Sequence, residues 1–164
     1  IRDSYNTSIL QIERMNFMKK TLKLIAVFFA ALFVLLGCGK EESSSFELNQ
    51  NGVTSVLTYY YNNDLVTKQT ATNTYDLKQL GVTEEDAKKQ IEGVNNKYTA
   101  VDGVTASIES KDGTLIQTLT VDYTKAKVSE LRKAFPQEFT GDGDKISFKA
   151  SKESLLQAGY KEKK

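Results

Sequence analysis

The chain has 164 residues, with 22 basic and 21 acidic side chains, one Cys, one Pro, no His and no Trp. Without His there is no Ser-His-Asp or Cys-His catalysis and no imidazole metal ligand, and one Cys excludes an internal disulfide and a thiolate zinc site. The near-zero net charge gives no electrostatic reason to expect a nucleic acid as a partner. We therefore expect no cofactor, and the length suits one domain.

Residues 18–37 have the pattern of a signal peptide. Three lysines, at positions 19, 20 and 23, precede a run of 13 residues without a polar side chain, Leu24 to Leu36. A helix that spans a bilayer needs about 20 apolar residues. A shorter run, with basic residues before it and small residues after it, is typical of a secretory signal.

The end of this run, Leu35-Leu36-Gly37-Cys38, resembles the lipobox of bacterial lipoproteins. In that class of signals the Cys thiol receives a diacylglycerol and a peptidase cuts before the Cys. We therefore predict Cys38 as the lipid-attachment residue and Leu35, Leu36 and Gly37 as the cleavage signal. Two acyl chains would hold the protein at the membrane, since each buried methylene contributes about 0.8 kcal/mol. The alternatives are a short membrane anchor with a chance Cys and an ordinary secretory signal with a free thiol.

Residues 1–17 do not fit this scheme, because they are polar, mixed and without periodicity. We expect them to be an over-extended segment, since Met18 or Met15 could start the signal. Beyond residue 37 the chain carries 17 basic and 19 acidic side chains, an ordinary balance for a soluble domain. Residues 38–45 are predicted to be the lipidated Cys and a flexible polar tether, and residues 46–164 a single domain.

Strand and helix signals alternate in this domain. Val53 to Tyr61 and Leu65 to Tyr75 are rich in β-branched and aromatic residues and flank a turn cluster, which predicts a hairpin. A helix is predicted at about 84–98, with Thr83 as N-cap and one apolar face.

A second hairpin is predicted from the alternation at 104–109 and 115–123 around Asp112-Gly113. A short helix should end at Pro136, and Ile146 and Phe148 indicate a short strand. Ser151 is predicted to cap a last helix that ends near Gly159.

Asn51-Gly52-Val53-Thr54 and Asp102-Gly103-Val104-Thr105 each open a hairpin that a helix follows. The spacing suggests a duplicated β-β-α unit, although two ordinary turns could share these residues. Either way, we expect an α+β fold with a mainly antiparallel sheet built from two hairpins, each followed by a helix.

Several segments in this order resemble the YehR-like family of bacterial lipoproteins. They are Gln50-Asn51-Gly52-Val53, Thr58-Tyr59-Tyr60-Tyr61, Val66 to Thr70, Leu80-Gly81-Val82-Thr83 with Ala87-Lys88-Lys89, and Leu119 to Ala126. The resemblance runs from about Cys38 onward and implies a compact α+β domain on a lipid anchor. It implies no catalytic residue, because the family has no assigned activity.

Three segments are candidate sites. Tyr59-Tyr60-Tyr61 could present aromatic rings to a ligand, but adjacent aromatics in a strand more often pack in a core. Gly141-Asp142-Gly143-Asp144 has part of a calcium-loop pattern, but Ile146 stands where a ligand is needed, so a solvated turn is expected. Glu84-Glu85-Asp86 suits the first turn of a helix.

These observations predict a lipid-anchored domain at the extracytoplasmic face of a bacterial membrane, which binds an envelope protein or a small ligand and is not an enzyme. One alternative is a hydrolase that uses carboxylates, Ser or Lys, which would require two carboxylates with raised pKa values in one cleft. The other is a structural or adhesive envelope protein, which would show a broad exposed aromatic patch.

Overall fold

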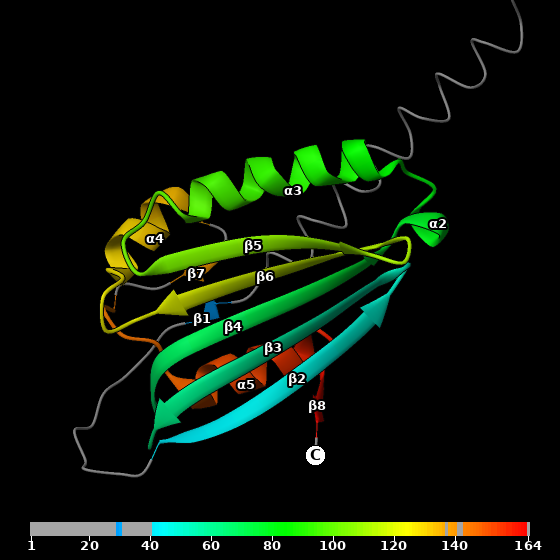
Figure 1. Cartoon of the computed structure of the whole chain (residues 1–164). Coiled ribbons are helices and arrows are strands. Elements are labelled where there is room, and N and C mark those ends of the chain that lie inside the picture. Colours follow the sequence, from blue (N-terminus) through cyan, green and yellow to red (C-terminus); the bar gives the residue numbers. More distant parts are fainter. Residues whose placement is uncertain (1–28, 31–40, 137, 141–142, 164) are drawn as a thin grey trace, which may run out of the picture.

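A six-stranded antiparallel sheet dominates the structure, a computed structural model that describes residues 29–30, 41–136, 138–140 and 143–163. Its strands are β2 (Glu42–Gln50), β3 (Val53–Asn62), β4 (Leu65–Asp76), β5 (Val104–Lys111), β6 (Thr114–Asp122) and β8 (Lys161–Lys163). They lie in the order β5-β6-β4-β3-β2-β8 (Figure 1). A separate two-residue parallel pair joins β1 (Phe29–Ala30) to β7 (Phe139–Thr140).

The described helices pack against one face of this sheet. They are α2 (Leu77–Leu80), α3 (Glu84–Tyr98), α4 (Val128–Ala134) and α5 (Phe148–Gln157). Helix α3 begins as predicted, because the Thr83 side chain accepts a hydrogen bond from the backbone N–H of Asp86. The α+β fold with a mainly antiparallel sheet is therefore confirmed.

Both predicted hairpins form. The β5–β6 turn places Asp112 and Gly113 at positive φ, 49° and 76°, as a two-residue turn between right-twisted strands requires. In the β3–β4 hairpin the register shifts between Tyr60 and Tyr61, so that Tyr60 pairs with Lys68 and Tyr61 with Val66. This bulge keeps Tyr61 and Val66 on the helix-covered face.

The two hairpins share a local geometry. Gly52 accepts a 2.8 Å backbone hydrogen bond from Asp76, and Gly103 accepts one of 2.9 Å from Asp122. Each of these bonds joins the glycine before a hairpin to the last residue of that hairpin. The first unit adds α2 between its hairpin and its long helix. A duplicated β-β-α unit remains a prediction that this local likeness supports.

Three sequence expectations are wrong. Residues 42–45, placed in the flexible tether, belong to β2 and pair with Tyr61 to Thr58, because the neighbouring strand satisfies their backbone groups. Ile146 and Phe148 do not form a strand. Ser147 rather than Ser151 caps α5, and Phe148 is the first residue of that helix. Ser151 is buried inside α5 and donates a 2.7 Å hydrogen bond to the Ser147 carbonyl.

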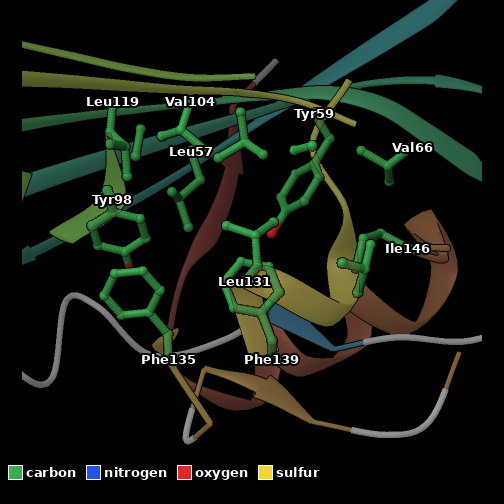
Figure 2. Close-up of a cluster of buried hydrophobic side chains, with 14 of the residues drawn as sticks. Leu57, Tyr59, Val66, Tyr98, Val104, Leu119, Leu131, Phe135, Phe139 and Ile146 are labelled. Carbon is green, nitrogen blue, oxygen red and sulfur yellow. The ribbon is translucent and has the colours of Figure 1, made fainter. Parts of the chain in front are cut away.

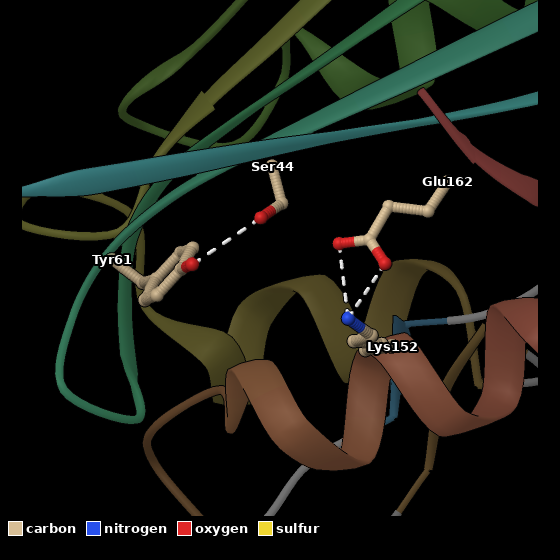
Figure 3. Close-up of polar contacts among 4 residues, drawn as sticks. All are labelled: Ser44, Tyr61, Lys152 and Glu162. Carbon is tan, nitrogen blue, oxygen red and sulfur yellow. Dashed lines mark hydrogen bonds and ion pairs between the residues drawn. The ribbon is translucent and has the colours of Figure 1, made fainter. Parts of the chain in front are cut away.

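Strand β8 and helix α5 are held together at the β2 side of the sheet. Lys152 of α5 donates to both carboxylate oxygens of Glu162 at 2.7 and 2.9 Å (Figure 3). Next to this pair, the hydroxyl oxygens of Ser44 and Tyr61 lie 3.2 Å apart. The first contact holds β8 to α5, the second joins β2 to β3, and β8 itself pairs with β2 at Ser45 to Glu47.

The core lies between the sheet and the helices. Its larger part joins side chains of the strands to Tyr98, Leu131 and Phe135 from α3, α4 and the residue after α4 (Figure 2). The Tyr98 and Phe135 rings stack with centroids 3.8 Å apart. A smaller part packs Ala87 and Ile91 of α3 on β3, β4 and β6.

Candidate interaction surface

The second face of the sheet is open, in that no helix of the described chain packs on it. Figure 1 views the sheet with α5 behind β2 and β3. We call the centre of this face the open face; its half-buried side chains are mostly threonine and carry no charge. They are Thr54, Val56, Thr58, Thr70, Thr72, Thr74, Ile116, Thr118 and Thr120.

Cross-strand pairing arranges these side chains in rows. Thr58 pairs with Thr70, and Thr70 with Thr120. In the next row Thr72 lies between Val56 and Thr118. Side chains in directly opposed pairs have Cβ atoms about 5 Å apart, so each row presents methyl and hydroxyl groups side by side.

Two ion pairs lie at the border of the open face. Lys163 binds Glu47 at 2.7 Å on the β8 side. At the other border Lys125 lies 3.3 Å from Asp122, and hydrogen bonds from Thr124 lower the pKa of the Asp122 carboxyl. The open face therefore offers hydroxyl donors, hydroxyl acceptors and methyl groups, which suits a broad contact with a flat partner.

The tyrosine triplet is divided between the two faces. Tyr59 is fully buried, and the Tyr61 ring stacks on Phe148 of α5 with centroids 3.6 Å apart. The expectation that these aromatics pack in the core is confirmed for both. Tyr60 alone faces the other side, where the Lys68 ammonium lies 3.9 Å from its ring centroid, a cation–π contact at the border of the open face.

The other predicted residues fall into two groups. Cys38 and the cleavage signal at Leu35, Leu36 and Gly37 lie outside the described residues, as do residues 141–142 of the Gly-Asp segment. Glu84, Glu85 and Asp86 form the first turn of α3, which confirms their expected place near the positive helix end. In the described part of the chain, no three Asp, Glu, Cys or His residues converge as a metal site would require.

One carboxyl has an unusual environment. Glu138 accepts a hydrogen bond from the Tyr98 hydroxyl beside β7. Burial raises the pKa of Glu138 from its ordinary 4.5 to about 7, although the Tyr98 hydrogen bond opposes the change. The hydrolase alternative requires two such carboxylates together, whereas Glu138 has a tyrosine hydroxyl as its hydrogen-bond partner.

A buried polar chain crosses the core, and the sequence did not reveal it. Gln117 Oε1 accepts hydrogen bonds from Asn73 Nδ2 and from the Tyr75 hydroxyl, both at 2.9 Å. Gln117 Nε2 donates to Asn95 Oδ1 of α3 at 2.6 Å. The one sequence signal for this polar chain was Gln117, because its amide lies on the apolar side of β6, the strand with the most regular alternation.

Residues 42–161 match a family described as "Protein of unknown function (DUF1307)", and the chain belongs to this family. Its curated relatives are proteins named as uncharacterised lipoproteins. One from Listeria innocua is 44% identical over 151 residues, which is 90% of this chain and 98% of the relative. YehR of Escherichia coli is 31% identical over 153 residues, 90% of this chain and all of YehR. The YehR-like resemblance is thereby confirmed.

Solved structures agree with the fold. The NMR structure of Escherichia coli YehR is similar with a TM-score of 0.63 at 29% identity, over 77% of this chain and 93% of that structure. A protein from Streptococcus pneumoniae shares the fold at 13% identity, with a TM-score of 0.52 over 81% of this chain and 91% of that structure.

The helices of the described part of this chain are too short or too polar to span a bilayer.

Proposed function

We propose that this chain is a bacterial lipoprotein, held by an acylated Cys38 at the extracytoplasmic face of a membrane, with a non-catalytic binding domain beyond the anchor. Leu35-Leu36-Gly37-Cys38 supports the anchor, together with relatives that are named as lipoproteins. The open face supports the binding role. It is uncharged at its centre, ordered by cross-strand pairs, and left uncovered by the described helices.

The two alternatives have less support. The buried positions of Tyr59 and Tyr61 remove most of the aromatic patch that an adhesive surface would need. The hydrolase alternative requires two neighbouring carboxylates with raised pKa values, whereas the described residues offer Glu138 beside a tyrosine.

The anchor is tested by partitioning between detergent and aqueous phases and by mass spectrometry of the mature N-terminus. The unaltered protein should enter the detergent phase and carry a diacylglycerol on Cys38. The Cys38→Ala variant should lose this lipid and leave the membrane fraction. Unchanged membrane retention of Cys38→Ala would defeat the lipid anchor.

The binding role is tested with a photo-reactive amino acid at Val56, in the middle of the open face. Irradiation of native membranes should give a discrete crosslinked product. The product should disappear when Thr72, the cross-strand neighbour of Val56, is also changed to Arg. Lys88, exposed on α3, is the matched control position and should give no such product. Equal products at both positions would contradict the assignment of the open face.

A further inference from the structure

The two edges of the six-stranded sheet differ in how they are covered. Strand β8 pairs with Ser45 to Glu47 and covers the middle of β2. Strand β5 forms the opposite edge, and no described strand pairs with its outer side (Figure 1). An edge strand exposes backbone groups that can pair with another chain, so proteins usually protect it with a proline, a bulge or a charge that points inward.

Strand β5 has none of these protections. Its eight residues include no proline and pair with β6 without a register shift. Its charged residues, Glu109 and Lys111, are exposed and alternate with Ala106 and Ile108, so they lie on the side of the sheet that carries the open face. Ala106 and Ile108 pack on the core side, where they are only half-buried. The outer side of β5 is therefore suited to accept a further strand.

The β5–β6 turn determines which backbone groups of β5 point outward. Asp112 and Gly113 form a two-residue turn, so the flanking pair of Lys111 and Thr114 exchanges both backbone hydrogen bonds. Bonded and non-bonded pairs alternate along an antiparallel ladder, which directs the N–H and C=O groups of residues 106, 108 and 110 away from β6. Within the described chain, no backbone group of a loop or helix bonds to these three residues.

Helix α3 lies beside this edge without occupying its backbone. It contacts β5 and β6 on the core side, where Asn95 accepts a 2.6 Å hydrogen bond from Gln117 of β6. Thr105, Ser107 and Ser110 of β5 are exposed. The backbone of the edge is thus accessible to another chain.

We propose that β5 pairs with β5 of a second copy of this chain, in antiparallel orientation, so that the two six-stranded sheets become one. The twofold axis is perpendicular to the sheet and passes through the middle of β5, where either Ser107 or Ile108 faces its own counterpart. Each of these centres joins the outward groups by about six backbone hydrogen bonds. Each also places the half-buried Ile108 opposite Ala106 or Ile108 of the second copy.

Charge and closure favour a second copy as the occupant. At both centres Glu109 and Lys111 face uncharged residues of the second copy, whereas a centre at Glu109 would oppose two carboxylates. Pairing of β5 with β2 of another copy would produce an open chain of copies, and β8 interrupts that pairing. A β5–β5 pair is closed, and it turns both open faces to the same side. The inference depends on neither the lipid anchor nor the binding role of the open face.

Disulfide formation tests the pairing in the full chain with Cys38→Ala, which removes the native thiol. Ser107→Cys and Ile108→Cys are introduced one at a time. Directly opposed residues of an antiparallel pair have Cα atoms about 4.5 to 5.5 Å apart, within the range of a disulfide. Lys111→Cys is the control on the same strand, because its two copies would lie about 20 Å or more apart at either centre.

We expect a covalent dimer after oxidation of Ser107→Cys or Ile108→Cys, and little from Lys111→Cys. The position that gives the dimer identifies the centre. Equal yields at the three positions would indicate random collisions and would overturn the pairing. Absence of a dimer at both Ser107→Cys and Ile108→Cys would overturn it as well.

A proline separates backbone pairing from contact between side chains. Ala106→Pro removes an outward N–H and leaves the hydrogen bonds to β6, so it should abolish the disulfide dimer. Asn49→Pro is the matched control: its N–H points outward from β2, beyond the part that β8 covers, and the dimer should persist. Urea unfolding checks that the variants fold, and Ser110→Pro replaces Ala106→Pro if that variant does not. An undiminished dimer in a folded proline variant of β5 would overturn the strand pairing.

Discussion

Gln117 of β6 donates a 2.6 Å hydrogen bond to Asn95 of α3 across the interior of the domain. The same Gln117 side chain accepts hydrogen bonds from Asn73 and Tyr75 on the neighbouring strand β4. One amide thus joins the central strands to the longest helix. All four residues are buried, so each of these hydrogen bonds replaces a hydrogen bond to water that the side chain makes only in the unfolded chain.

Gln117→Leu should destabilise the domain by about 3 kcal/mol or more, because three buried polar groups lose their partner at once. The free energy of unfolding in urea is the measurement. Thr118→Val, the next residue on the same strand but on the open face, is the control and should stay within about 0.5 kcal/mol of the unaltered protein. Equal stability of Gln117→Leu and Thr118→Val would show that the polar chain contributes little.

Gly103 and Gly113 give a matched test of backbone strain. Both have positive φ, 79° and 76°, but a Cβ on Gly103 would lie 2.7 Å from the Ala126 nitrogen, whereas one on Gly113 would meet nothing within 4 Å. Gly113→Ala should cost about 1 kcal/mol, and Gly103→Ala about 3 kcal/mol. Thermal and urea unfolding of the two variants would check this order, and a reversed order would contradict the close packing at Gly103.

Stability should depend on pH through Glu138. Its pKa is about 7 in the folded protein and near the ordinary 4.5 in the unfolded chain. The folded state therefore binds more protons than the unfolded state between these values, and this contribution to stability is lost as the pH rises from about 4.5 to about 7. Glu138→Gln should remove that part of the slope. Urea titrations of both proteins across the window would show it, and identical slopes would refute the assignment.

Phe148 is expected to contribute strongly to the packing of α5. It is 8% exposed, and its ring stacks on Tyr61. Phe148→Ala should cost about 3–4 kcal/mol, since it removes a large buried side chain and leaves a cavity. Leu156 on the same helix is 47% exposed, so Leu156→Ala should cost less than about 1 kcal/mol. Unfolding measurements on both variants test whether Phe148→Ala lowers the free energy of unfolding more than Leu156→Ala does.

The features with a local signal could be predicted from the sequence. Asp112-Gly113 favours positive φ, and Thr83 before three acidic residues favours a helix start, and both form as expected. Features that depend on distant partners could not be predicted. Ser43 to Ser45 have no strand pattern of their own and become a strand only beside Tyr60 to Thr58. Ser147 and Ser151 are equally good caps, and Asp64, 83 residues before Ser147, binds the one that is used.

The open face could be predicted only in part. The alternation of Thr118 and Thr120 with Leu119 and Val121 indicates one wet side of β6. The sequence does not tell that β4 pairs with β6, and this pairing brings the threonines of three strands onto one surface. Which side chains share this surface depends on the order of the strands in the sheet, and the sequence of one segment does not determine that order.

Strand β8 has a consequence for self-association. Its three residues are all charged, and it covers only Ser45 to Glu47 along the outer side of β2. The proposed lipid anchor would confine copies of this protein to one membrane at high local concentration, which favours strand addition between exposed sheet edges. A short charged strand, fixed by Lys163 to Glu47 and by Glu162 to Lys152, covers the middle of this edge and interrupts the continuous backbone that a neighbouring copy would need for a long strand pairing.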